Sequence, residues 1–303
     1  MNQLSQKVFE SYQIRKTKKQ KQDFTAFLQT HIPELHVQET VFPKCRNLII
    51  GDPTTAKLIL TAHYDTCPQL PFPNFITPKK PLLCILYSLV IAIPFLLIVF
   101  LLNYLLNLLY LNYWVQSAIS LLVYAALIYL VFFGPANKTT ANDNTSGVIT
   151  LLEIYQSLSA QQKAEVCFVF FDNEEKGLLG SSMFRKKYKK QVKDKLLVNF
   201  DCVSDGDHFL LGVSKSASQK YQSILSSVYT PTDTKHVLLE NLKKIHYPSD
   251  QAGFPMAMAV AALNYKKPLG YYMDKIHTKR DTVFQEENIQ YLKDRTIQLI
   301  DLM

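Results

Sequence analysis

The chain has 303 residues, a formal net charge of +8 and five cysteines, and 48% of its residues are hydrophobic. This length suits one large domain or two modest ones, and the positive charge favours an anionic neighbour, either nucleic acid or a phospholipid surface. The cysteines are odd in number, widely spaced and without a CxxC pair, which argues against a disulfide framework and for a reducing compartment.

The start of the chain predicts a helix followed by strands. Apolar spacing over residues 6–30 predicts the helix, which also carries a basic cluster at 15–21. Residues 35–50 have the pattern of two short strands, and the run KLILTA (57–62) is typical of a buried strand. That run ends in HYD (63–65). The N-terminus lacks the apolar segment of a secretory signal.

The next segment has the composition of a membrane hairpin. Between Lys80 and Lys138 there are 57 residues without Asp, Glu, Lys, Arg or His. Two apolar runs, 82–102 and 115–133, each reach the roughly 20 residues that a helix needs to cross a bilayer. The connector 103–114 combines Asn, Tyr and the only Trp, a mixture typical of a membrane interface. A hairpin buried in a soluble core is the alternative, but such a hairpin rarely lacks charge on every face.

Two membrane crossings return the chain to the side it left. We therefore expect residues 1–80 and 135–303 to form one domain that the hairpin, 81–134, interrupts. The positive-inside rule places this domain and both termini in the cytoplasm, because lysines flank the hairpin and its turn carries no charge. These lysines are Lys79, Lys80 and Lys138.

The remainder of the chain alternates strand and helix patterns. Strands are predicted at 166–171, 196–200, 208–213, 237–240 and 256–263. Helices are predicted at 148–158, 176–188, 216–228 and 285–302. This alternation predicts an α/β domain with a mostly parallel central sheet flanked by helices.

Side chains that bind metal ions follow several of these strands. The pair Glu174 and Glu175 comes directly after the strand 166–171, and taken alone it favours a solvated helix start. The carboxyl ends of parallel strands, however, gather ligands at one edge of a sheet. Histidine nitrogen and carboxylate oxygen suit Zn²⁺, and a surplus carboxylate can act as general base. The candidates are His63, Asp65, Asp143, Glu174, Glu175, Asp201 and His277.

Five short motifs together resemble the signature of the co-catalytic di-zinc exopeptidases of peptidase clan MH. This family includes bacterial leucyl aminopeptidases, glutamate carboxypeptidase and the glutaminyl cyclases. The resemblance covers roughly 35–75 and 138–303, in matching order and spacing, with the hairpin as an insertion. The motifs are HYD (63–65), NDN (142–144), NEE (173–175), Asp201 and IHT (276–278).

The resemblance implies two divalent metal ions with a shared ligand. Asp143 would bridge them, Glu175 and His277 would complete one ion's set, and His63 and Asp201 the other's. Zinc is the expected metal, although cobalt and manganese accept the same ligand types.

The same resemblance implies roles for the neighbours of these ligands. Glu174 would be the general base, and Asp65 would hydrogen-bond the second ring nitrogen of His63. The peptide bond between Asp143 and Asn144 is expected to be cis.

Substrate contacts are predicted in two places. The family often has Ser-Asp-His near its substrate pocket, where this chain has Ser249, Asp250 and Gln251. Tyr271 and Tyr272 precede the last motif, and either would suit an oxyanion donor, with core packing as the favoured alternative.

The expected function is that of a membrane-anchored, metal-dependent exopeptidase that acts on peptides. Among exopeptidases, an aminopeptidase is the expected type. Glutaminyl-cyclase-like acyl transfer, which would use one metal, and a non-catalytic membrane scaffold are the alternatives. The intact ligand set counts against the scaffold. Membrane-delivered peptides and ordinary cytosolic peptides remain equally open as substrates.

Nucleic-acid binding is not expected, because no nucleic-acid-binding motif accompanies the positive charge. The basic runs at 15–21 and 185–195 are typical of solvated helix faces, with contact to an anionic leaflet as the less favoured alternative.

Overall fold

A nine-stranded sheet forms the centre of the structure, a computed structural model that describes residues 1–303. The strand order is β1-β2-β4-β3-β5-β8-β6-β7, and β9 pairs with β8. The four central strands, β4, β3, β5 and β8, run parallel. Toward the edges of the sheet, the pairs β1–β2, β2–β4 and β6–β8 are antiparallel. The strands are β1 (His36–Thr40), β2 (Cys45–Ile50), β3 (Leu58–His63), β4 (Val166–Phe171), β5 (Leu196–Phe200), β6 (His208–Val213), β7 (His236–Asn241), β8 (Ala257–Lys266) and β9 (Gly270–Tyr272).

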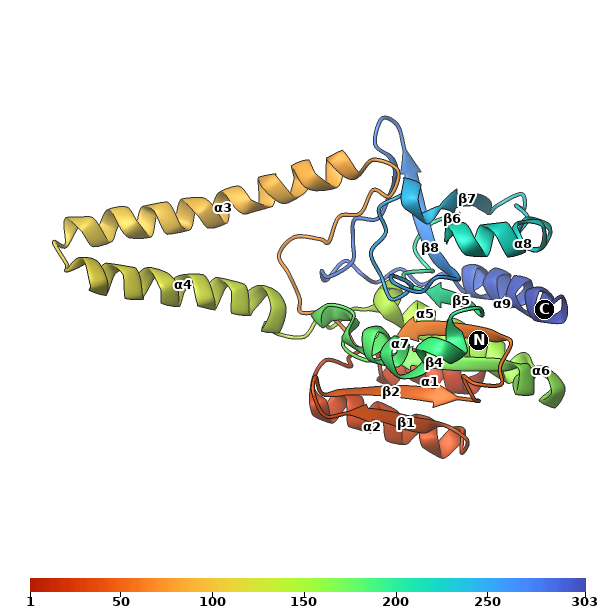
Figure 1. The fold of residues 1–303 in the computed structure, drawn as a ribbon. Helices are drawn as coiled ribbons and strands as arrows, with labels where there is room; N and C mark the ends of the chain where they lie inside the picture. Colours follow the sequence, from red (N-terminus) through yellow and green to blue (C-terminus); the bar gives the residue numbers. More distant parts are fainter.

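Helices cover both faces of this sheet, which gives the three-layer α/β architecture expected from the alternation of patterns (Figure 1). The larger apolar core lies between one face and α1, α2, α5, α8 and α9, and a smaller core lies between the other face and α7. The helices of the domain are α1 (Gln3–Ser11), α2 (Lys18–His31), α5 (Gly147–Ser157), α6 (Ala160–Glu165), α7 (Leu179–Val192), α8 (Lys215–Val228) and α9 (Glu286–Asp301).

The central strand β3 shows why its sequence has no polar alternation. Leu58 and Leu60 belong to the larger core, whereas Ile59 belongs to the smaller core on the opposite face. A strand buried on both faces needs apolar side chains at successive positions. The predicted site residue of this strand, His63, therefore lies at its end.

The N-terminal region contains two helices where the sequence predicted one over 6–30. α1 ends at Ser11, and α2 begins at Lys18 with Thr17 as its N-cap in a capping box with Gln20. Arg15 lies in the break between them, fully buried, and its Nε donates to the backbone carbonyl of Tyr64 at 2.5 Å. A continuous helix would not bring this guanidinium to the end of β3.

The basic cluster at 15–21 is only partly the solvated helix face that its composition predicted. Besides Arg15, Lys21 is buried, and its ammonium forms an ion pair with Asp172 and donates to Asn173 Oδ1 at 2.9 Å. The prediction was wrong for these two residues because they compensate carboxylates and carbonyls inside the domain. Lys18 in the same cluster is exposed, as predicted.

Two long helices, α3 (Pro81–Leu108) and α4 (Tyr113–Phe133), project from the domain as a hairpin (Figure 1). α3 is longer than the predicted span 82–102, so most of the predicted connector 103–114 is helical. Asn103 lies inside this helix, where its Nδ2 donates to the carbonyl of Val99 and its Oδ1 accepts from Ser120 of α4, both at 2.9 Å.

Both helices have the length and composition to cross a membrane. At about 1.5 Å per residue they are about 42 Å and 32 Å long, against a hydrocarbon core of about 30 Å. Within them only Val99, Leu106 and Ser120 are buried by other parts of the protein. Their apolar side chains therefore face outward, unlike those of a helical pair in a soluble core.

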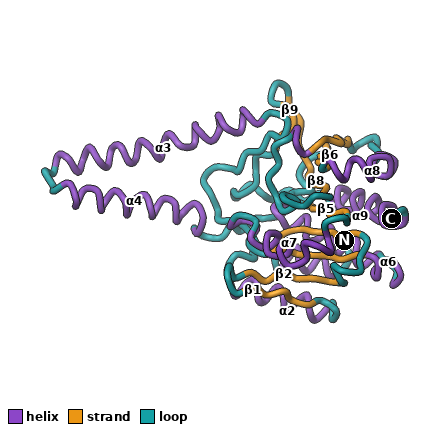
Figure 2. The backbone as a smooth tube through the Cα atoms, viewed as in Figure 1, coloured by secondary structure: helices purple, strands orange, loops and turns teal.

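The segments that lead into and out of the hairpin pair with each other at a short neck, 67–69 with 135–137, although the domain ends of α3 and α4 themselves lie apart (Figure 1). The backbone N–H of Asn137 donates to the carbonyl of Cys67 at 3.1 Å, and that of Gln69 to Pro135 at 2.8 Å. The neck lies on the side of the domain where loops follow the parallel strands (Figure 2). The hairpin thus projects from the functional edge of the sheet.

Replacing Lys21 with Ala leaves the Asp172 carboxylate buried without its cation. We expect a loss of about 3–5 kcal/mol in the free energy of unfolding, the usual cost of removing one partner from a buried ion pair. Urea unfolding of the full chain in detergent, followed by circular dichroism, measures this loss. Lys18→Ala, on the exposed face of the same helix, is the matched control and should change stability by less than about 0.5 kcal/mol. Equal effects of the two substitutions would contradict the structural role given to Lys21.

Candidate metal centre

The parallel strands bring three predicted site segments to one edge of the sheet. His63, the last residue of β3, pairs with Phe171, the last residue of β4. On the other side of β3, Thr61 pairs with Asn199 of β5, and continuing this register sets His63 level with Asp201. The loops that carry the HYD, NEE and Asp201 motifs therefore start at the same height.

Asp143 comes from a tight turn, Ala141–Ser146, that leads into α5. The Asp143–Asn144 peptide bond is cis, as the family resemblance implied. The Asn144 side chain donates to the carbonyl of Phe200 and accepts from the N–H of Gly147, both at 3.0 Å. A Cβ at Gly147 would lie 2.4 Å from that same carbonyl, so only glycine allows the turn to approach β5 this closely.

One group of donor atoms is formed by His63, Asp143 and Asp201. The Nε2 of His63 lies 3.3 Å from Oδ1 of Asp143 and 3.4 Å from Oδ1 of Asp201. All three side chains are buried, and their donor atoms lie within 4.8 Å of one another.

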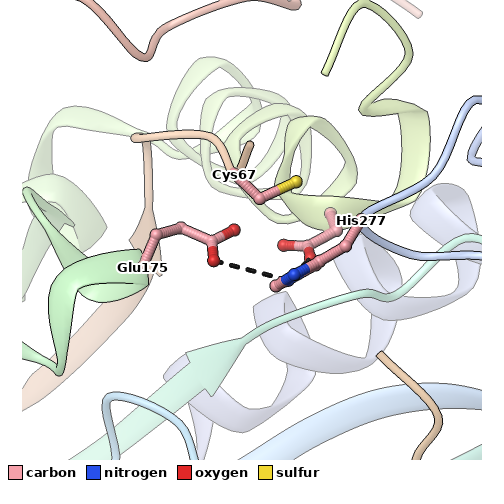
Figure 3. A group of neighbouring side chains, drawn as sticks. Cys67, Glu175 and His277 are labelled. Carbon is pink, nitrogen blue, oxygen red and sulfur yellow. Dashed lines mark ion pairs between the residues drawn. The ribbon is translucent and has the colours of Figure 1, made fainter. Parts of the chain in front are cut away.

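A second group uses the other oxygen of Asp143. The Nε2 of His277 lies 3.1 Å from Oδ2 of Asp143 and 3.3 Å from Oε2 of Glu175 (Figure 3). Cys67 directs its sulfur toward the same space, and the four donor atoms lie within 4.8 Å of one another. Asp143 thus offers one oxygen to each group.

The chemistry of these two groups fits divalent metal ions. Glu175 Oε1 is buried without a hydrogen-bond partner, and burial raises the pKa of this carboxyl to about 8. Burial alone would lower the pKa of His277, but the carboxylates of Glu175 and Asp143 raise it to about 9. The centre is therefore short of positive charge, and its nitrogen and oxygen donors are those that zinc, cobalt and manganese accept.

Asp65 organises the centre differently from what its spacing predicted. Its carboxylate accepts from the backbone N–H groups of Glu174 and Glu175, at 2.9 and 3.3 Å. Its backbone carbonyl lies 3.1 Å from Nδ1 of His63, closer than its carboxylate oxygen at 3.7 Å. The carbonyl is thus the nearer acceptor for Nδ1 of His63. In the tautomer that carries its proton on Nδ1, Nε2 is free to bind a cation.

Glu174 begins a short 3-10 turn, Glu174–Lys176, which two residues separate from the end of β4. Asn173, in the left-handed conformation with φ of 57°, turns the chain at this point and is held by Lys21 and by the carbonyl of Lys44. Burial raises the pKa of Glu174 well above its usual value. A carboxyl so placed has a high proton affinity and lies beside the donor groups.

Two residues of the centre were missed by sequence reasoning. Asp281 accepts from the backbone N–H groups of Asn142 and Asp143, at 2.8 and 3.0 Å, and thereby holds the bridging loop. In the sequence, the signal available for this role was the position of Asp281, four residues after His277. Cys67 follows the HYD motif by two residues, but a cysteine that can ligate a metal is not distinguishable in sequence from a small buried one.

The predicted substrate residues lie in different surroundings. Ser249 is buried and accepts from Asn199 Nδ2 at 2.9 Å, while Asp250 is buried near His63, and burial raises its pKa to about 7. Asp250 thus belongs to the surroundings of the metal centre, and Ser249 braces β5.

The two predicted tyrosines lie on β9, at the sheet edge. The Tyr271 ring packs against His208 and Tyr265, with centroids 5.3 and 4.9 Å apart, and Tyr272 pairs with Asn264 of β8. These contacts match the packing alternative. A phenol closer to the centre is Tyr247, which is buried and donates to the Asp201 carbonyl at 2.9 Å.

Comparison with known proteins gives a family and a fold. Residues 126–300 match the family model described as "Peptidase family M28". A probable leucine aminopeptidase of Arthroderma otae is 28% identical over 155 residues, which are 47% of this chain and 42% of the relative. The chain thus matches less than half the length of this curated relative.

Two solved structures share the fold over nearly the whole chain. A glutaminyl cyclase of Porphyromonas gingivalis has a TM-score of 0.58 and 16% identity, over 99% of this chain and 95% of that one. A Zn-dependent exopeptidase of Parabacteroides distasonis has a TM-score of 0.54 and 15% identity, over 98% and 94%. At these identities the likeness concerns the fold.

Replacing Asp281 with Ala should weaken metal binding without removing a donor atom. Loss of a residue that orients a ligand typically costs about 10–100-fold in metal affinity. Competition with a chromophoric chelator measures the affinity of the full chain for zinc. Asp294→Ala, on the exposed side of α9, is the control and should bind as the unchanged protein does. Unchanged affinity in the Asp281 variant would refute its role in holding the Asp143 loop.

Proposed function

We propose that this chain, which belongs to peptidase family M28, is a membrane-anchored aminopeptidase. It would use two divalent metal ions, with zinc as the expected metal, to hydrolyse peptides. The observation that carries this proposal is the pair of donor groups that share the Asp143 carboxylate, with Glu174 beside them. Asp143, Glu175 and His277 would hold one ion, and Asp143, His63 and Asp201 the other. When bound, such ions polarise a carbonyl and lower the pKa of water.

Glu174 would take the proton of the attacking water and return it to the leaving amine. Its backbone is fixed by Asp65, and its burial favours the protonated form that the second transfer needs. Asp65 would serve as a positioning residue, since the same carboxylate sets the places of both glutamates.

The donor groups also bear on the alternatives. A one-metal cyclase would leave one group without a purpose, and a non-catalytic scaffold would leave both. The two groups sharing Asp143 therefore favour hydrolysis over cyclisation and over a purely structural role.

Membrane anchoring is supported by the outward-facing apolar helices and by the position of charge. Lys80 at the start of α3 donates to the carbonyl of Pro268 at 2.5 Å, and Lys79 pairs with Glu240. These lysines bind to the domain at the base of the hairpin, whereas its tip, 109–112, has no charge. We propose that the bilayer lies around the hairpin and that the domain and both termini are cytoplasmic.

Glu174→Gln should lower kcat for hydrolysis of leucyl peptides by about 10²–10⁴-fold, the usual contribution of a general base, while two metal ions stay bound. Peptide turnover and metal analysis of the same purified sample give both quantities. Glu165→Gln, at the end of α6 away from the donor groups, is the control and should keep full activity.

Full activity of the Glu174 variant would remove the base assignment. A pyroglutamate product from glutaminyl peptides, with one zinc per chain, would replace the aminopeptidase by the cyclase. Turnover that survives complete metal removal by a chelator would contradict the metal-dependent mechanism altogether.

The topology predicts the behaviour of reporters fused after Met303. A reporter that is active only after export should stay inactive, and one that is active only in the cytoplasm should be active. The protein should also remain with the membrane after extraction at alkaline pH. An active exported reporter would reverse the orientation, and release by alkali would exclude membrane insertion.

A further inference from the structure

One candidate ligand of the metal centre, His277, borders a pocket at the base of the hairpin. A pocket of about 290 Å³ lies between His277 and the first turns of α3. Its walls include Phe72 and Phe75 from the loop after β3, and Tyr87 and Ile91 from α3. A residue of the second donor group is therefore part of a pocket that also touches the hairpin.

A second cavity, of about 400 Å³, lies between α3 and α4 and has only hydrophobic residues in its walls. It shares Phe72 and Ile91 with the pocket at His277. It is bordered by Val131 near the domain end of α4, and further along the hairpin by Val99 of α3 and Tyr124 of α4. We call this cavity the interhelical groove. Because two residues border both spaces, the groove continues the pocket away from the metal centre.

The loop between the two spaces is tied to both of them. Leu70 donates its backbone N–H to the carbonyl of His277 at 2.8 Å. Tyr87 of α3 donates to the carbonyl of Pro73 at 3.0 Å, and the rings of Phe72 and Phe95 lie 6.2 Å apart, edge to face. The wall shared by pocket and groove is thus anchored to a candidate ligand on one side and to a hairpin helix on the other.

We propose, on the basis of the proposed function, that the substrates are peptides that carry a long hydrocarbon chain, which lies in the interhelical groove while the scissile bond lies at the metal centre. The polar end of such a substrate meets the donor groups. Tyr124 is the only residue of the groove walls with a polar side-chain atom, so most N–H and C=O groups of a peptide backbone inside the groove would stay unpaired, which is costly in an apolar environment. A hydrocarbon chain has no such groups, and the transfer of its CH₂ groups from water into the groove is favourable.

The hairpin has the dimensions for this role. From Tyr87 to Val99 the axis of α3 rises about 18 Å, at about 1.5 Å per residue. The groove thus extends the binding site well beyond the residues next to the scissile bond. In this arrangement the hairpin selects substrates as well as anchoring the enzyme.

The test compares leucyl dodecylamide with leucyl ethylamide as substrates of the full chain in phosphatidylcholine liposomes. Ile91→Trp and Val131→Trp fill the groove, and each should lower kcat/KM for the dodecylamide at least tenfold relative to the ethylamide. Leu97→Trp and Leu130→Trp are matched controls, because these residues are 60% and 54% exposed and do not line the groove. They should leave the ratio unchanged.

Other outcomes overturn the proposal in distinguishable ways. An unchanged ratio in the groove variants, or an equal fall in the controls, would exclude hydrocarbon binding in the groove. If the groove variants lost activity toward both substrates while the control variants kept it, the groove would be assigned to a structural lipid or to packing. A preference for a penta-leucine amide over the dodecylamide, abolished by the same variants, would replace the hydrocarbon chain by an apolar peptide. If the unchanged protein hydrolyses neither leucyl amide nor any leucyl peptide, the proposed function itself fails.

Discussion

The carboxylate of Asp143 is the point on which the arrangement of the centre depends. One of its oxygens lies against His63 and the other against His277, residues that are 214 positions apart in the chain. Two carboxylates and two histidines from separate loops are grouped around it; His63 and Asp201 are buried, and Glu175 and His277 are half-buried. Such a concentration of buried donors is unfavourable without cations, so the surrounding structure must hold the loops in place.

The structure holds these loops chiefly through their backbone atoms. Asp65 accepts two successive backbone N–H groups of the NEE loop. Asp281 does the same for two successive N–H groups of the NDN loop. Two buried cations also support these loops: Arg15 donates to the Tyr64 carbonyl, and Lys21 forms an ion pair with Asp172. The donor side chains are thereby directed toward the centre. This is the division of labour expected between ligands and the residues that orient them.

The parts of this architecture that were predictable are those with a local signal. β3 and β4 are continuous apolar runs, and the residues that follow them become neighbours once the strands are parallel, so the convergence of His63 and Glu175 followed from pattern and topology. Arg15 and Lys21 were misplaced because a buried cation and a solvated one have the same local sequence. Asp281 was missed since its role lies in accepting N–H groups from a loop about 140 residues earlier. The connector of the hairpin was predicted too long because asparagine and tyrosine residues signal an interface without ending a helix.

The position of the hairpin in the chain constrains how the domain is assembled. β3 pairs only with β4 and β5, and both of these strands come after the hairpin in sequence. During synthesis β1 and β2 can pair at once, but β3, which is largely apolar, has no partner until more than 100 further residues have been made. A hairpin that enters the bilayer in that interval keeps the waiting strand at the membrane surface, close to where its partners will emerge. The insertion would then act as an assembly tether, and the metal centre would be completed last, when His277 arrives.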